Sequence, residues 1–249
     1  MVALTGQPSV PPLRLPPAYS LVTLRESKDA FKHACRIAAE AGAGTLVWVR
    51  RFDLVEFAVV LEPAEALAPA RRGFFAGMVA LADALASHSP PERAVTFGWP
   101  DTLRFNGARL GGARLGWPKA CAEEEVPHWL VFSAMLLSAK VDTGDPGLTP
   151  AVTWLEEEGF EPSHGPAIIE SFARHLMLAF ASWADLGFEA VSERYLTRLS
   201  LVPGDTSRAI DTNGDLLISR AEQLERVPLL PALIRSDWLD PGTSMPRLA

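Results

Sequence analysis

The sequence contains little lysine, and most of its positive charge comes from arginine. Of 23 basic residues, 19 are arginines and 4 are lysines, Lys28, Lys32, Lys119 and Lys140, and the net charge is −7. The chain therefore lacks the lysine-rich tails that coat nucleic acids or membrane surfaces. Its acidic balance also offers no broad patch for phosphate backbones. We expect neither a nucleic-acid partner nor a membrane partner.

Cysteines and long apolar runs are also scarce. The two cysteines, Cys35 and Cys121, lack the spacing of metal ligands, which predicts free thiols in a reducing cytoplasm and no metal site built from them. The longest apolar run, residues 129–139, is far shorter than the ~20 residues that span a bilayer. No basic start followed by an apolar core is visible, so we expect no secretory signal. The heavy use of alanine and arginine is typical of GC-rich bacterial genomes.

The composition predicts one large domain and one small one. The 249 residues are 48% hydrophobic, which is enough for a sizeable core. Prolines crowd residues 1–20, and because proline lacks a backbone donor we expect an extended arm there. From about residue 196 the chain changes to short apolar pieces separated by turns. We therefore place the large domain at residues 21–195 and a small β-rich domain at residues 196–249.

Hydrophobic periodicity predicts a mixture of helices and strands. Helices are expected over residues 29–41, with Ser27 as the cap, over 71–86 and 166–184, and from Thr149-Pro150 to Gly159. Strands are expected over residues 45–50, 54–61, 94–97, 103–105, 108–115, 129–138, 200–202 and 216–219. Because regular βαβ alternation is missing, we predict an α+β fold. It would consist of a mixed, largely antiparallel sheet packed with helices and a small β-rich C-terminal unit.

The most informative stretch runs from Trp99 to Gly112. It begins with Trp99-Pro100-Asp101, continues into Asn106-Gly107 and ends with Arg109-Leu110-Gly111-Gly112. Asn-Gly is a strong hairpin signal because both turn positions need a positive φ. The stretch resembles the central signature of the biotin/lipoate protein ligase family, where Lys-Trp-Pro-Asn-Asp leads into an Asn-Gly hairpin and Lys-Leu-(Ala/Gly)-Gly. The register holds without a gap over fourteen positions.

The resemblance implies a ligase fold and a ligase activity for residues 21–195. In such a protein ATP and Mg²⁺ activate a carboxylic acid (biotin, lipoate or octanoate), and the acyl group passes to a lysine of a carrier protein. By position in the motif, Arg109 would take the catalytic role of clamping the acid and the phosphate. Substrate and ATP contacts are implied for Trp99, Pro100, Asp101, Asn106, Gly107, Gly111, Gly112, Arg50, Arg51 and Ser27.

Three departures from the family pattern bear on this chemistry. Arg109 stands where the family has lysine; it stays cationic and can grip an anion with two bonds, but it places its charge differently. The Asn-Asp pair is replaced by Asp101-Thr102, which would turn the remaining acid to the other strand face. The glycine-rich loop between the first two strands is replaced by Arg50-Arg51-Phe52-Asp53, which cannot easily wrap a phosphate without glycine.

Two alternatives to a ligase therefore stay open. One is a non-catalytic homologue that binds an acyl or nucleotide-like ligand. The other is a protein similar to the octanoyl/lipoyl transferases, which use a cysteine nucleophile. Cys121 follows Lys119 by two residues, but the acidic run 123–125 is expected to raise the pKa of its thiol. Cys35 lies on the apolar face of the first predicted helix and is expected in the core.

Overall fold

The fold is built on a seven-stranded sheet. The computed structural model describes residues 12–140, 151–200, 202–220 and 223–248. In spatial order the strands are β1 (Ser20–Arg25), β2 (Thr45–Arg50), β3 (Leu54–Leu61), β7 (Leu130–Leu137), β6 (Ala108–Gly116), β5 (Thr102–Phe105) and β4 (Val95–Gly98). β1 and β2 run parallel, and every other neighbouring pair in this order is antiparallel. The predicted α+β class with a mixed, largely antiparallel sheet is confirmed.

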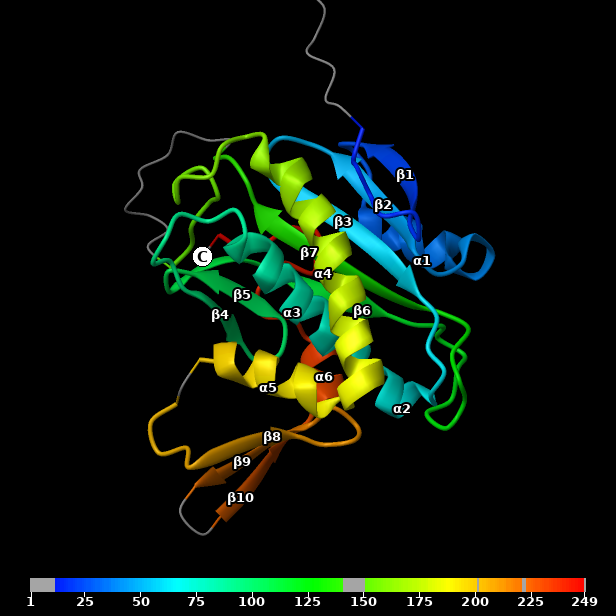
Figure 1. The fold of residues 1–249 in the computed structure, drawn as a ribbon, viewed down its shortest axis with the longest axis vertical. Helices are drawn as coiled ribbons and strands as arrows, with labels where there is room; N and C mark the ends of the chain where they lie inside the picture. Colours follow the sequence, from blue (N-terminus) through cyan, green and yellow to red (C-terminus); the bar gives the residue numbers. More distant parts are fainter. Residues whose placement is uncertain (1–11, 141–150, 201, 221–222, 249) are drawn as a thin grey trace, which may run out of the picture.

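Helices cover both faces of this sheet. α3 (Gly73–Ala86) and α4 (His164–Leu186) lie in front of it in Figure 1, preceded by the short α2 (Leu67–Ala70) and followed by α5 (Glu189–Arg198). α1 (Ala30–Ala41) packs on the opposite face. Along β3, odd-numbered residues such as Phe57 contact the core under α3 and α4, whereas Ala58 and Val60 contact the core under α1. This alternation follows from the two-residue period of a strand.

Aromatic rings dominate the core between the sheet and α3/α4. The ring of Phe172 on α4 lies 4.6 Å from that of Phe57 and 5.5 Å from that of Phe132, measured between centroids. Each such pair adds about 0.5–1.5 kcal/mol beyond the area that it buries. On the other face, Ala30, Ala34 and Ala38 form the buried side of α1. Small side chains let this helix lie close to the strands.

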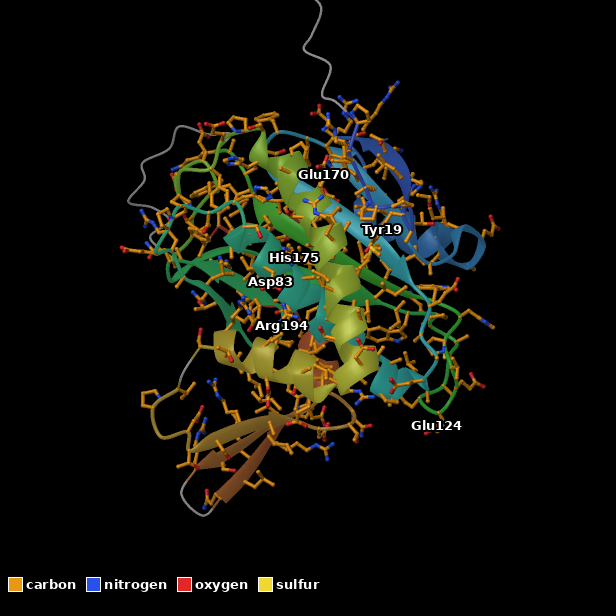
Figure 2. All side chains as sticks on the ribbon, in the orientation of Figure 1. Tyr19, Asp83, Glu124, Glu170, His175 and Arg194 are labelled. Atoms are coloured by element: carbon orange, nitrogen blue, oxygen red, sulfur yellow. The ribbon has the colours of Figure 1, made fainter. Side chains whose placement is uncertain are left out.

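An ionic cluster ties the three long helices of the front face together. The carboxylate of Asp83 on α3 pairs with Arg194 and, at 2.8 Å, with Arg198, both on α5. His175 of α4 lies 4.0 Å from the same carboxylate. Figure 2 shows Asp83, His175 and Arg194 close together on this face. The three helices thus share one partly buried charge.

The chain continues past α5 into a small antiparallel sheet and then returns to the main one. The small sheet has the order β10 (Gln223–Val227), β9 (Leu216–Arg220) and β8 (Ser207–Ile210), and it is followed by α6 (Leu229–Ile234). After α6, Trp238 is completely buried against Gly112 of β6. None of the helices in the described ranges is both long enough and apolar enough to cross a membrane.

Most predicted helices and strands are confirmed to within two residues, but the predicted helix ending at Gly159 is wrong. Residues 151–160 form turns and an isolated bridge, while Thr149 and Pro150 lie outside the described residues. The Arg109 N–H donates to the Ala151 carbonyl (2.8 Å), and the Thr153 N–H donates to the Arg109 carbonyl (3.0 Å). Pairing with the edge of β6 thus takes the place of helical hydrogen bonds.

Two smaller predictions are also wrong. Ser27 does not cap α1: the cap is Asp29, whose Oδ1 accepts a hydrogen bond from the Lys32 N–H at 2.9 Å. Ser200 and Val202 lie in no strand, and the residue between them is outside the described part. Leu199 instead makes a single bridge with Phe97, because the chain passes β4 there without running alongside it.

A methyl group at Gly77 tests how tightly α3 packs on the sheet. A Cβ there would lie 2.3 Å from ring carbons of Phe132, so Gly77→Ala must force the helix and the sheet apart. We expect the free energy of unfolding in urea to fall by about 1–3 kcal/mol. Gly73 is the matched control, because a Cβ there would meet no atom within 4 Å. Gly73→Ala should leave stability unchanged or raise it by up to about 1 kcal/mol; an equal loss in both variants would contradict the packing.

Candidate functional site

A buried carboxylate, that of Glu56 on β3, organises the α1 face of the sheet. Glu56 is 1% exposed. Its Oε1 accepts a hydrogen bond from the Ala30 N–H at the start of α1 (2.7 Å), and its Oε2 accepts one from Arg51 Nη1 (3.3 Å). Burial raises the pKa of this carboxyl, and the Ala30 N–H and the charge of Arg51 act against that rise. Because a carboxylate buried this deeply needs partners, it holds the first turn of α1 and a cation against the sheet.

Arg51 is committed to a local ion pair. Its Nε and Nη2 donate to the two carboxylate oxygens of Asp53, at 2.7 and 2.6 Å. Burial favours a raised pKa for Asp53, but the hydrogen bonds and charge of Arg51 outweigh it and hold that pKa below its usual value. The carboxylates of Asp53 and Glu56 therefore neutralise the charge of Arg51.

Arg114 on β6 brings a second cation to the same place. Its Nη2 lies 3.6 Å from Oδ1 of Asp29, and its guanidinium carbon lies 4.4 Å from the centre of the Phe31 ring. Nε and Nη2 are buried and have no hydrogen-bond partner in the described part of the chain. Burial lowers the pKa of Arg114, while Asp29 and Glu56 favour its charged form. A guanidinium with unused N–H groups beside a helix N-terminus suits an anionic ligand.

Asp101 is a buried acid next to the C-terminal part of the chain. It is 2% exposed, and its Oδ2 lacks a hydrogen-bond partner in the described residues. Burial raises the pKa of Asp101 to about 6, and the polar groups of Ser236, Trp238 and Thr102 oppose the rise. The acid of the Trp-Pro-Asp motif is therefore enclosed by residues from the far end of the sequence.

Arg109 and the two motif glycines also meet other parts of the chain. Nη2 of the half-buried Arg109 donates to the carbonyl oxygen of Arg247 at 2.7 Å. A Cβ on Gly112 would lie 2.4 Å from Cε2 of Trp238, and one on Gly111 would lie 2.0 Å from the carbonyl oxygen of Met135 on β7. Gly112 therefore leaves room for an indole ring, and Gly111 lets β6 approach β7 closely.

Trp99 and Pro100 face a different environment from Asp101. The Trp99 ring packs on Phe75 of α3, 5.7 Å between centroids, and Pro100 accepts a hydrogen bond from the Tyr195 hydroxyl (2.8 Å). Trp99 also lines a cavity of about 370 Å³ between β4, the segment that follows α5 and the small sheet. The structure thus separates Trp99 from the α1 face, although the motif places it two residues from Asp101.

Four other predicted site residues lie apart from this cluster. Asn106 and Gly107, with φ of 50° and 88°, form the exposed hairpin turn between β5 and β6. Arg50 is exposed at the end of β2, with its guanidinium 5.8 Å from the centre of the Trp48 ring. Ser27 is exposed before α1. The structure therefore brings together Arg51, Asp101, Arg109 and Gly112 around Glu56, Arg114 and the C-terminal segment.

Sequence reasoning missed Glu56, Arg114 and Trp238. The signal for the first two was a charged residue inside an otherwise apolar strand, at a position whose neighbours on the same face are buried. Trp238 carried no local signal, because its contact with Gly112 spans most of the chain.

The cysteines do not form a nucleophilic site. The pKa of the Cys121 thiol is raised by desolvation and by the nearby charges of Glu125 and Glu123. Burial raises the pKa of Cys35 to about 11, and this partly buried residue packs against the apolar cluster under α1. Neither thiol resembles an activated nucleophile.

The raised pKa of Asp101 predicts a pH-dependent loss of stability. Its pKa of about 6 lies above the usual aspartate value of 3.8, so between these two pH values the folded chain holds a proton that the unfolded chain releases. Stability therefore falls as the pH rises from about 4 through 6. Asp101→Asn removes this titration, so its unfolding free energy in urea, relative to wild type, should increase by about 2–3 kcal/mol between pH 4 and pH 7. The exposed Asp185→Asn is the control; a pH-independent difference for Asp101→Asn would contradict the burial.

The comparisons agree with this fold. The model of the Biotin/lipoate A/B protein ligase family matches residues 15–197. A comparison with curated proteins gives no match. A solved biotin protein ligase-like protein of unknown function from Silicibacter sp. TM1040 shares 26% identity, with a TM-score of 0.76 over 90% of this chain and 100% of that one.

Two biotin protein ligases show the same fold at lower identity. The enzyme from Aquifex aeolicus in complex with biotin and ATP is 12% identical, with a TM-score of 0.61 over 84% of this chain and 95% of that one. The enzyme from Leishmania major in complex with biotinyl-5-AMP is 14% identical, with a TM-score of 0.53 over 86% and 99%. Because the family model covers more than half of the sequence, the chain belongs to the biotin/lipoate A/B protein ligase family.

Proposed function

We propose that this protein binds a small carboxylic acid of the biotin, lipoate or octanoate class on the α1 face of its main sheet and activates it with ATP. The acid's carboxylate oxygen would attack the α-phosphorus of ATP, giving an acyl adenylate and pyrophosphate. An amine of a carrier-protein lysine would then take the acyl group and release AMP. Membership in the family supports this reaction class, as do solved members of the fold that hold biotin with ATP or biotinyl-5-AMP.

The guanidinium of Arg114 is the observation that carries the proposal. It lies on the sheet face next to the first turn of α1. Its Nε and Nη2 are buried and make no hydrogen bond within the described residues, and Nη2 has only a long ion pair with Asp29, at 3.6 Å. Unpaired buried donors are costly, and a carboxylate would satisfy both of them in one planar contact. Arg109, at the edge of the same face, would contribute the second cation. It can exchange its contact with the Arg247 carbonyl for a carboxylate or phosphate oxygen.

Asp101 could supply the carboxylate that an ATP-bound Mg²⁺ needs from the protein. Such an ion is usually held by one or two carboxylates together with phosphate oxygens and water. Asp101 has one carboxylate oxygen without a partner, and within the described ranges no group of three or more metal-ligating side chains exists. The ion would neutralise phosphate charge during the reaction.

Binding without catalysis is the second candidate function. Arg51 lies in the short β2–β3 connection, and its charge is paired with Asp53 and Glu56. This connection also has no glycine. Without glycine, this connection is poorly suited to wrapping a phosphate. A chain that bound the acid but released no pyrophosphate with ATP would fit this second candidate.

The proposal predicts that Arg114 controls affinity for the acid. In calorimetric titrations with biotin, lipoate and octanoate, at least one acid should bind the wild-type chain, and Arg114→Gln should bind it about tenfold or more weakly. Pyrophosphate release with ATP and the same acid should separate ligase from binder. Arg226→Gln removes an exposed arginine paired with Asp211 and Asp215 in the small sheet, so it should bind like wild type.

Two outcomes would contradict the proposal. One is equal affinity for the acid in wild type and Arg114→Gln. The other is no binding of any of the three acids, with or without ATP, to the wild-type chain or to Trp238→Ala, which removes the ring that lies over Gly112.

A further inference from the structure

The segment Ser236–Arg247, called the strap below, folds back over the candidate site as a hairpin. The Asp240 N–H donates to the Met245 carbonyl and the Arg247 N–H donates to the Trp238 carbonyl, both at 2.8 Å. The side chain of Asp240 closes the turn, because its Oδ1 accepts two backbone N–H groups that follow it, at 2.9 and 2.8 Å. These hydrogen bonds give the strap its shape while it lies on the sheet, and so short a hairpin would lose their protection once it left the sheet.

Trp238 anchors the strap in the space that Gly112 leaves open. Its side chain is completely buried, and its Cε2 and Nε1 lie 2.4 and 2.5 Å from where a Cβ of Gly112 would be. A tryptophan buries about 150–250 Å², so the indole covers much of this part of the sheet. Because Gly112 has no side chain, a flat ring can lie directly on its backbone. In this structure the ring of Trp238 occupies that space.

Three further contacts join the strap to the site. The Arg247 carbonyl accepts from Arg109 Nη2 at 2.7 Å, and Met245 Sδ lies 3.8 Å from Arg51 Nη1. Ser244 Oγ lies 3.2 Å from Nζ of Lys32 on α1. One segment of the chain thus touches two arginines of the candidate site and the helix beside them.

The fit of the strap is imperfect at its centre. The indole Nε1 of Trp238 and Oδ2 of Asp101 are both buried, and neither makes a hydrogen bond of normal geometry within the described residues. Trp238 and Ser236 nevertheless lie close enough to favour the charged form of Asp101, so the indole and the carboxylate are neighbours in a poor arrangement. Buried polar groups are normally well paired, and water would satisfy both groups better than the strap does.

We infer that the strap is an internal competitor that occupies the place of the acid and must be released before a ligand enters. This inference rests on the proposed function of the α1 face. In this inference the Trp238 ring occupies the space that the apolar part of the ligand would take. The Arg247 carbonyl oxygen occupies the position at Arg109 that an anionic oxygen of the ligand would take. If the strap is released in only a tenth of the molecules, the apparent affinity for the acid falls about tenfold.

Two variants of the full chain loosen the strap in different ways. Trp238→Ala removes the anchor, and Asp240→Ala weakens the turn without touching the site. Calorimetric titration with biotin, lipoate and octanoate should show about tenfold tighter binding to both variants than to wild type. Trp183→Ala, on α4 across the sheet, is the control for losing an indole, and the exposed Asp185→Ala is the control for losing a carboxylate.

Hydrogen exchange on the wild-type chain gives an independent result. Saturating acid should reduce protection of the Asp240 and Arg247 amides, which are hydrogen-bonded within the strap. If wild type and both variants bind the acid equally, or more weakly in Trp238→Ala, and these amides stay protected, the strap is a fixed wall and the inference is wrong. If no chain binds any acid, the proposed function of the face fails, and the inference fails with it.

Discussion

The buried carboxylate of Glu56 is the constraint on which the candidate site depends. A strand that crosses the middle of a sheet places alternate side chains on each face, and Glu56 is the charged member on the α1 side of β3. Since an unpaired carboxylate cannot be buried there without a large cost, the first N–H of α1 and the Arg51 guanidinium must lie beside it. Arg114 reaches the same region from β6 and is held in its charged form by Asp29 and Glu56.

This constraint gives the two faces of the sheet different properties. The face under α3 and α4 is closed by large aromatic and aliphatic side chains and is suited to stability. The face beside α1 carries charges and a glycine, and it is covered by a segment from the other end of the chain. The α1 face therefore combines apolar packing against α1 with the charged groups that the proposed ligand would contact.

The helices and strands of the main sheet could be predicted from the sequence because each follows from a local pattern of apolar residues or turn residues. The strands at Thr45–Arg50 and Leu54–Leu61 and the Asn106-Gly107 hairpin follow from alternation and turn chemistry. The prediction of a helix that ends at Gly159 was wrong because residues 151–153 form hydrogen bonds with Arg109 instead. A contact between residues so far apart leaves no local pattern in the sequence.

The site was predicted less completely, for the same reason. The motif located Asp101, Arg109 and Gly112, but it could not show that Arg51 is paired with Asp53 or that Trp238 fills the space over Gly112. Contacts between distant parts of the sequence decide which cations remain available to a ligand. Arg109, which stands where the family has lysine, is itself hydrogen-bonded to the strap.

A crystal structure of the full chain with the acid that binds best, together with ATP, would test the central claim most directly. The account predicts the acid on the α1 face, with its carboxylate hydrogen-bonded to Arg114 and the Trp238 ring displaced from Gly112. An acid bound elsewhere, with Trp238 still lying on Gly112, would contradict it.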